Sequence, residues 1–104
     1  MAMTANPPIT IITCRAENFG GYGGQVADVA VTFVNAYASS ASSVRFGLTY
    51  HGKLALATAK GTYAPNVKVT ERFHVFVDQF YKGKTMDDCG VVHAAFADGS
   101  AWPP

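Results

Sequence analysis

The segment Gln25–Ala36, QVADVAVTFVNA, decides the fold of this chain. Its apolar residues recur at every second position, so that Ala27, Val29, Val31 and Phe33 share one face. Successive side chains of a β-strand point to opposite sides, whereas a helix needs apolar residues three or four positions apart. The segment therefore predicts a strand that packs one face against a hydrophobic core.

Segment 44–50 alternates in the same way, and its inward side chains are predicted to be Val44, Phe46, Leu48 and Tyr50. The next two residues, His51-Gly52, predict a tight two-residue turn into a neighbouring strand at 53–60. Leu54 and Leu56 have strand spacing in that segment. We therefore prefer a strand there to the helix that the intervening alanines favour on propensity.

Further strands are predicted at 9–15, 67–77, 90–97 and 100–102, each short and bounded by turn-forming residues. Asp98-Gly99 is the strongest signal in the chain for a two-residue hairpin. We expect the core to contain Val29, Val31, Phe33, Val44, Phe46, Leu48, Val69 and Phe96. About seven short strands with turns between them predict an all-β fold, a single immunoglobulin-like antiparallel β-sandwich.

Glu71 and Arg72 interrupt the otherwise apolar segment 67–77. A strand of this length is expected to contain a bulge, which we place near these two residues. Their charges either pair across the edge of a sheet or keep an edge strand from adding a neighbour. We prefer the second interpretation.

Cys14 and Cys89 are the only cysteines, and each lies near the end of a predicted strand. A bridge between them closes a loop of about 75 residues and, in the loop-entropy model, stabilises the fold by roughly 4 kcal/mol. We therefore predict one disulfide. Two unpaired, buried thiols are the alternative that remains open.

The bulk composition describes one domain and limits the classes of partner. The 104 residues carry 8 Lys and Arg against 7 Asp and Glu, without a basic cluster. Nucleic acids and anionic membrane surfaces bind concentrated positive charge, so neither is an expected partner. No apolar stretch is long enough to span a membrane.

The N-terminal segment 1–8 is predicted to be extended, and the domain to occupy 9–104. Segment 1–8 lacks the basic and apolar regions of a signal peptide. Either the chain is cytosolic with two thiols, or it is the mature form of an exported protein whose leader was replaced. Because Met1-Ala2-Met3 resembles a cloning join, we expect an exported protein, periplasmic or extracellular, with its leader absent from this chain.

The glycine-rich segment Phe19–Gly24, FGGYGG, is the most unusual in composition. Glycine lets a ligand approach the backbone, and Phe19 and Tyr22 offer ring faces to a sugar or a partner. The segment is not a dinucleotide fingerprint, because Val26 occupies the third glycine position. Phe19 and Tyr22 are thus the candidate ligand-binding residues. The alternative is a plain connection whose aromatic rings pack on the edge of the sandwich.

No other residues form a convincing chemical motif. The histidines, His51, His74 and His93, lack the spacing of metal ligands and are interpreted as a turn residue and two strand-surface residues. Asp78, Asp87 and Asp88 lack the alternating oxygen ligands of a calcium loop. There is no Gly-x-Ser-x-Gly nucleophile motif. We therefore expect no metal, no cofactor and no catalytic residue.

Several strand and turn motifs carry a resemblance to a known group of proteins. They are Val29-x-Val31-x-Phe33-x-Asn35, Ser43-Val44-Arg45-Phe46-x-Leu48-x-Tyr50-His51-Gly52, Tyr63-Ala64-Pro65-Asn66-Val67 and Phe96-Ala97-Asp98-Gly99-Ser100-x-Trp102. The chain resembles small exported bacterial immunoglobulin-like domains of uncharacterised function. The resemblance implies a sandwich with a bridging cysteine pair and no assigned activity. Antibody-type function is not implied, because antibody domains bridge two middle strands around a tryptophan.

Two functional hypotheses follow. The first is a non-catalytic exported immunoglobulin-like module that acts by surface recognition of another protein or as a structural piece. The second is a small-ligand or carbohydrate-binding module that uses Phe19 and Tyr22. A concave, aromatic-lined pocket under the glycine segment would favour the second hypothesis, and a flat surface or an open strand edge would favour the first.

Overall fold

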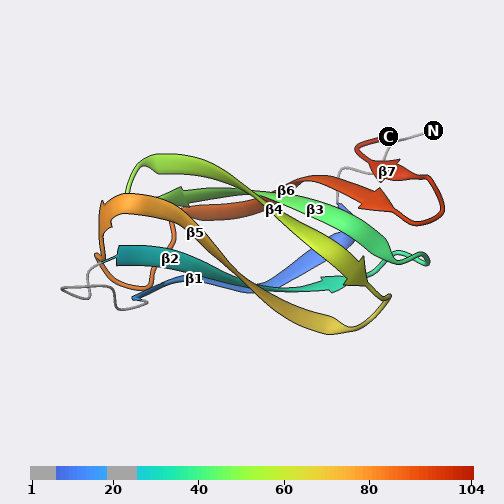
Figure 1. Cartoon of the computed structure of the whole chain (residues 1–104), viewed down its shortest axis with the longest axis horizontal. Helices are drawn as coiled ribbons and strands as arrows, with labels where there is room; N and C mark the ends of the chain where they lie inside the picture. Colours follow the sequence, from blue (N-terminus) through green and yellow to red (C-terminus); the bar gives the residue numbers. More distant parts are fainter. Residues whose placement is uncertain (1–6, 19–25) are drawn as a thin grey trace.

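The computed structural model describes residues 7–18 and 26–104 and arranges them as two antiparallel β-sheets packed face to face (Figure 1). The strands are β1 (Ile9–Asn18), β2 (Val26–Asn35), β3 (Ala41–Tyr50), β4 (Lys53–Tyr63), β5 (Lys68–Phe80), β6 (Asp88–Phe96) and β7 (Ala101–Trp102). One sheet has the order β1-β2-β5 and the other the order β4-β3-β6-β7. The predicted all-β sandwich is confirmed.

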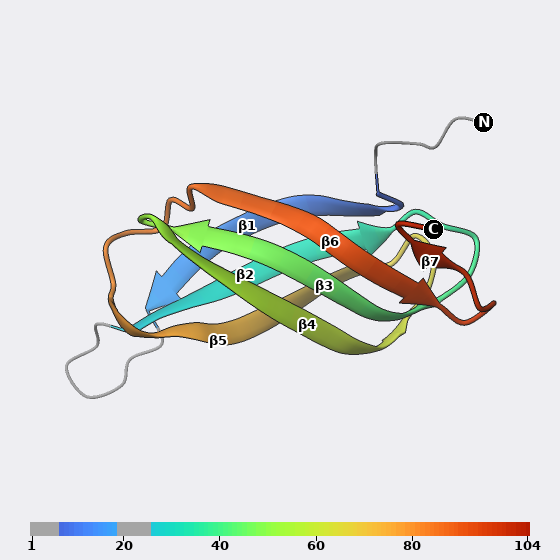
Figure 2. The ribbon, with the colours of Figure 1, turned by 90° about the horizontal axis from the view of Figure 1, so that it is seen from above.

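The chain passes from one sheet to the other after β2, after β4 and after β5. Figure 2 shows the four-stranded sheet overlying the three-stranded one, with the strands of the two sheets crossing at an angle. In an immunoglobulin constant domain the fourth strand belongs to the same sheet as the first two strands. Here β4 pairs with β3 instead, so the second sheet is the wider one.

The core lies between the sheets and is built mainly from β2 and β3. The Phe33 ring is fully buried and packs against the rings of Phe46 and Tyr63, with centroid separations of 5.3 Å and 5.2 Å. The buried members of the expected core are Val29, Val31, Phe33, Val44, Phe46, Leu48 and Phe96. Val69 is only partly buried, because its strand β5 forms an edge of its sheet.

The β3–β4 hairpin sets which face of β4 meets the core. Its two turn residues, 51–52, have positive φ angles of 46° and 83°, as a type I′ turn requires. In the resulting register Leu48 lies opposite Ala55, and opposed residues of an antiparallel pair share a face. The alanines of β4 therefore face the core, and Leu54 and Leu56 lie together on the outer face.

Two local predictions need correction. Glu71 and Arg72 themselves pair regularly with β2, and the bulge expected in β5 is present but lies beyond Phe73. There, β5 has one more residue than β2 between successive pairs, because Ala27 faces Phe76 whereas Val29 faces Phe73.

The β6–β7 hairpin has a four-residue connection at 97–100, not the predicted two-residue turn. Asp98 explains the longer loop, because its carboxylate accepts hydrogen bonds from the backbone N–H and the hydroxyl of Ser100. These bonds also hold the pKa of Asp98 below its usual range. Gly99 supplies the positive φ, 89°, that the loop needs.

Cys14 and Cys89 form the predicted disulfide, with their Cα atoms 6.6 Å apart and a sequence separation of 75. The bridge joins β1 to β6 and therefore ties one sheet to the other. Antibody domains bridge their second and sixth strands instead.

Candidate functional site

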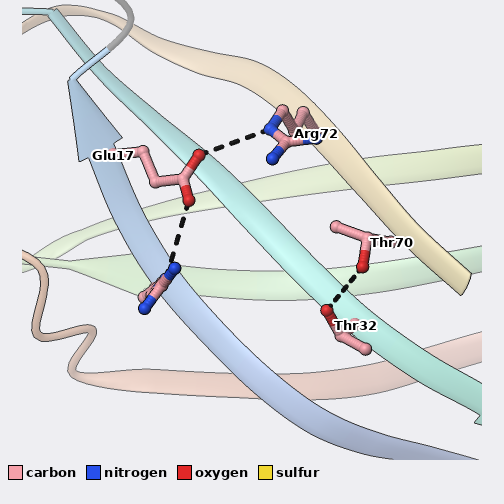
Figure 3. Close-up of polar contacts among 5 residues, drawn as sticks. Glu17, Thr32, Thr70 and Arg72 are labelled. Carbon is pink, nitrogen blue, oxygen red and sulfur yellow. Dashed lines mark hydrogen bonds and ion pairs between the residues drawn. The ribbon is translucent and has the colours of Figure 1, made fainter.

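Polar side chains on the outer face of the three-stranded sheet bind one another (Figure 3). Arg72 Nε donates to Glu17 Oε1 at 3.3 Å, and Arg15 Nε lies 3.6 Å from Glu17 Oε2. Beside them, the hydroxyls of Thr32 and Thr70 lie 2.7 Å apart and share a hydrogen bond. These side chains stand on β1, β2 and β5, so the contacts span all three strands of the sheet.

Asp28 lies on the same outer face, directly opposite Glu17 in the β1–β2 pair. Its side chain is buried and contacts Nδ1 of His74, whose ring is exposed. A buried carboxylate needs such a partner, because removing it from water without a hydrogen bond is costly. His74 therefore satisfies Asp28. Among the described residues, no group of three or more His, Cys, Asp or Glu side chains could hold a metal ion.

The outer face of the four-stranded sheet is apolar at its centre. Leu54, Leu56 and Val92 are 71%, 57% and 42% exposed. A Cβ atom on Gly47 would lie 3.3 Å from Cγ1 of Val92 and 4.0 Å from Cδ2 of Leu56. The side chains of β4 and β6 therefore lean toward each other over the glycine of β3. We call Gly47, Leu54, Leu56 and Val92 the apolar patch.

Strand register and a bulge assemble the apolar patch. Gly47 pairs with Leu56 of β4 on one side and with Gly90 of β6 on the other. Between Val91 and His93, β6 contains one residue more than β3, and this extra residue is Val92. Bulges redirect a side chain relative to the regular pleat, which brings Val92 onto the outer face over Gly47.

Charged side chains flank the apolar patch at its two ends along the strands. At one end Asp88 lies beside Thr49, which is opposite Leu54. At the other end Arg45 lies beside His93, and Arg45 Nε donates to Oγ1 of Thr58 at 3.3 Å. The face is thus negative at one end and positive at the other.

A shallow hollow of about 140 Å³ lies at the seam between β4 and β5. Residues 53–55 and 75–79 line it, and Lys53 and Asp78 contribute opposite charges. Phe76 supplies the aromatic ring among these lining residues, and it belongs to the buried core. The hollow is open and small, so it suits the edge of a larger partner better than an enclosed small molecule.

Phe19 and Tyr22 lie outside the described residues, so the ligand site at the glycine segment stays a prediction. The structure places the three histidines apart from one another. His51 stands in the β3–β4 turn, and His74 and His93 lie on the outer faces of different sheets, as interpreted from the sequence. Asp87, which lacks the sequence pattern of a calcium loop, accepts a hydrogen bond from the backbone N–H of Gly52 at 2.9 Å.

The sequence interpretation did not identify the apolar patch. The signal was present, because counting from Tyr50 through a two-residue turn assigns Ala55 to the inner face and Leu54 and Leu56 to the outer one. Val92 has no such signal, since its position depends on a bulge.

Comparison of the chain with models of known protein families, with curated proteins and with solved structures finds no match. Within residues 7–18 and 26–104, no helix has the length and hydrophobicity needed to cross a membrane. The chain is a small two-sheet antiparallel sandwich closed by one disulfide.

Proposed function

We propose that this chain is a non-catalytic, exported immunoglobulin-like module that recognises another protein through the outer face of its four-stranded sheet. The observation that carries the proposal is the apolar patch, in which Leu54 and Leu56 are more than half exposed. Clustered apolar side chains rimmed by polar groups mark protein interaction surfaces.

The contrast between the two outer faces supports this choice of surface. On the three-stranded sheet, Glu17 binds both Arg15 and Arg72, and the threonine hydroxyls bind each other. On the four-stranded sheet, Leu54, Leu56 and Val92 face water on neighbouring strands around Gly47. The exposed apolar residues of the three-stranded sheet stand instead on its two edge strands, with Ile12 on β1 and Val77 and Phe80 on β5. Removing apolar side chains from water is favourable, so the four-stranded sheet has the face that a partner would cover.

The shape of this face favours a protein over a small ligand. The apolar patch lies on a pleated sheet, and the hollow at the β4–β5 seam is shallow. Small molecules bind in concave sites that enclose most of their surface, whereas protein interfaces are broad.

Export is supported by the Cys14–Cys89 bond, because disulfides persist in oxidising compartments such as the periplasm and the extracellular space. The resemblance to small exported bacterial immunoglobulin-like domains agrees with this placement. The structural role proposed from the sequence is compatible with the same surface, since a structural piece also binds its neighbours.

Capture with surface variants tests the proposal. The immobilised protein is exposed to an extract of the native cell envelope, and the bound proteins are compared among wild type, Leu56→Asp and Ile12→Asp. Ile12 is the matched control, because it is 48% exposed on β1, in the other sheet. We expect a specific partner to be lost with Leu56→Asp and kept with Ile12→Asp. A partner retained equally by both variants would show that recognition lies elsewhere.

A further inference from the structure

We propose that the partner is a second copy of this chain, and that the apolar patch is the centre of a two-fold symmetric, face-to-face dimer. This inference rests on the proposed function and names its partner. In the dimer the two four-stranded sheets pack against each other, with the strands of one copy antiparallel to those of the other. The symmetry axis lies in the interface and crosses the strands at Gly47.

The order of side chains along the outer face leads to this arrangement. Three rows run across β4, β3 and β6, and their central strand contributes Thr49, Gly47 and Arg45. The Thr49 row ends in Asp88, and the Arg45 row ends in His93. Because successive residues on one face are about 7 Å apart along a strand, the two charged rows lie at similar distances on either side of Gly47.

A two-fold axis through the middle row exchanges the two outer rows. The Asp88 carboxylate of each copy then faces His93 of the other copy, with Arg45 on the neighbouring strand within reach of the same carboxylate. Each contact occurs twice, and Leu56 meets its own counterpart at the axis. An isologous interface requires a face that is complementary to itself. A face with this charge order is complementary to itself only when the strands of the two copies are antiparallel.

The flanking charges are available for such contacts. Among the described residues, Asp88 and His93 make no ion pair, and Arg45 makes only its hydrogen bond to Thr58. Lys53 lies at the same end as Asp88, but it is opposite Tyr50 and belongs to the inner side of β4. On the other sheet, in contrast, the acidic and basic side chains already pair within the chain.

Gly90 makes close packing feasible. A Cβ atom on Gly47 would meet Val92 and Leu56 of the same chain, whereas a Cβ atom on Gly90 would meet nothing within 4 Å. The Val92 side chain of the facing copy can therefore enter above Gly90, which lies beside Gly47 in the middle row. Two sheets pack with their inner side chains interdigitated at a separation of about 10 Å. Burial of both apolar patches removes leucine and valine side chains from water in one step.

Sedimentation velocity over a wide range of protein concentrations tests the proposal, with Ile12→Asp as the control. We expect wild type and Ile12→Asp to form dimers. Leu56→Asp places two carboxylates at the axis, and Asp88→Arg opposes Arg45 of the other copy. Each change should raise the dimer dissociation constant at least about tenfold. Circular dichroism and thermal melting confirm that each variant folds.

Exchanging the charges of residues 45 and 88 tests the order of charges along the face. Arg45→Asp alone should weaken the dimer, and the double variant Asp88→Arg with Arg45→Asp should recover most of the lost affinity, because the reversed pairs attract again. High salt should weaken the wild-type dimer by screening the pairs at the rim.

Each other outcome overturns a stated part of the proposal. A wild-type chain that stays monomeric overturns self-association and leaves the capture experiment to decide the proposed function. A dimer that survives Leu56→Asp has a different interface. A dimer that is lost with both charge reversals and is not recovered by the double variant does not have the antiparallel arrangement.

Discussion

The hydroxyl of Tyr63 donates a hydrogen bond to the carboxylate of Glu71 at 2.9 Å and joins β4 to β5 at the seam between the two sheets. Tyr63 is buried, and its ring packs on Phe33. Burial, the hydrogen bond to Glu71 and the charge of Glu71 together raise the pKa of Tyr63 to about 12. Glu71, which interrupts an apolar strand in the sequence, therefore has a partner across the sandwich.

This bond predicts a loss of stability in alkali. The folded pKa of Tyr63 lies above its ordinary value of 10.0, so the neutral phenol stabilises the fold fully below pH 10.0. The stabilisation is lost as the pH rises toward about 12. In that interval the free energy of unfolding of wild type should fall by about 2 kcal/mol more than that of Tyr63→Phe. Urea titrations of both proteins at a series of pH values measure the difference, and parallel pH profiles would contradict it.

The disulfide should supply a large share of the stability. Replacing Cys14 and Cys89 by alanine frees a loop of 75 residues in the unfolded chain, and we expect a loss of roughly 4 kcal/mol. Denaturant midpoints of the oxidised protein, the reduced protein and the double variant measure this loss. The native, unreduced protein should also not react with a thiol-alkylating reagent, and two alkylated cysteines would show that the bond is absent.

Phe46 and Leu54 test which faces are buried. Phe46 is fully buried and its ring lies 5.3 Å from Phe33 and 5.8 Å from Phe73, so Phe46→Ala should cost roughly 3–5 kcal/mol through lost contacts and a residual cavity. Leu54→Ala is the control, because Leu54 is 71% exposed and its loss should cost less than about 0.5 kcal/mol. Equilibrium unfolding of both variants measures the costs. Similar costs would mean that the β3–β4 register is wrong.

The buried face of a strand could be predicted from the sequence where only one of its faces is apolar. In β2 and β3 the large residues occupy a single face, and that face is the core, as in Phe33 and Phe46. In β4 both faces carry apolar residues, and size is misleading, because the smaller alanines face the core. Phe46 and Leu48 of β3 lie directly opposite Ala57 and Ala55 and fill the interior themselves, so small partners are required.

Only the Leu54 and Leu56 part of the candidate site could be predicted from the sequence, because the apolar patch as a whole forms only through strand pairing. Leu56 and Val92 are distant along the chain and lean toward each other because β4 and β6 both pair with β3 at Gly47. Alternation shows which residues of one strand share a face, but it does not locate a bulge, and the position of Val92 depends on one. The disulfide, in contrast, could be predicted because two cysteines allow a single pairing.

The last prediction concerns Tyr50, which holds the connection between β5 and β6. Its buried hydroxyl donates to the carbonyl of Gly83 at 3.1 Å and accepts from the backbone N–H of Lys82 at 2.5 Å. Tyr50→Phe keeps the ring against Phe76, at a centroid distance of 5.6 Å, but removes both bonds. We expect a loss of about 1–3 kcal/mol, because two backbone groups lose their partner.

Hydrogen exchange distinguishes this local effect from a general one. In Tyr50→Phe the amide of Lys82 should exchange faster by a larger factor than the amides in the middle of β3, because the released connection opens without unfolding the sheet. Tyr37→Phe is the matched control. Its hydroxyl donates to Asp98 in the β6–β7 loop and not to the β5–β6 connection, so the exchange at Lys82 should stay as in wild type. Unchanged exchange at Lys82 in Tyr50→Phe would show that other contacts hold this connection in place.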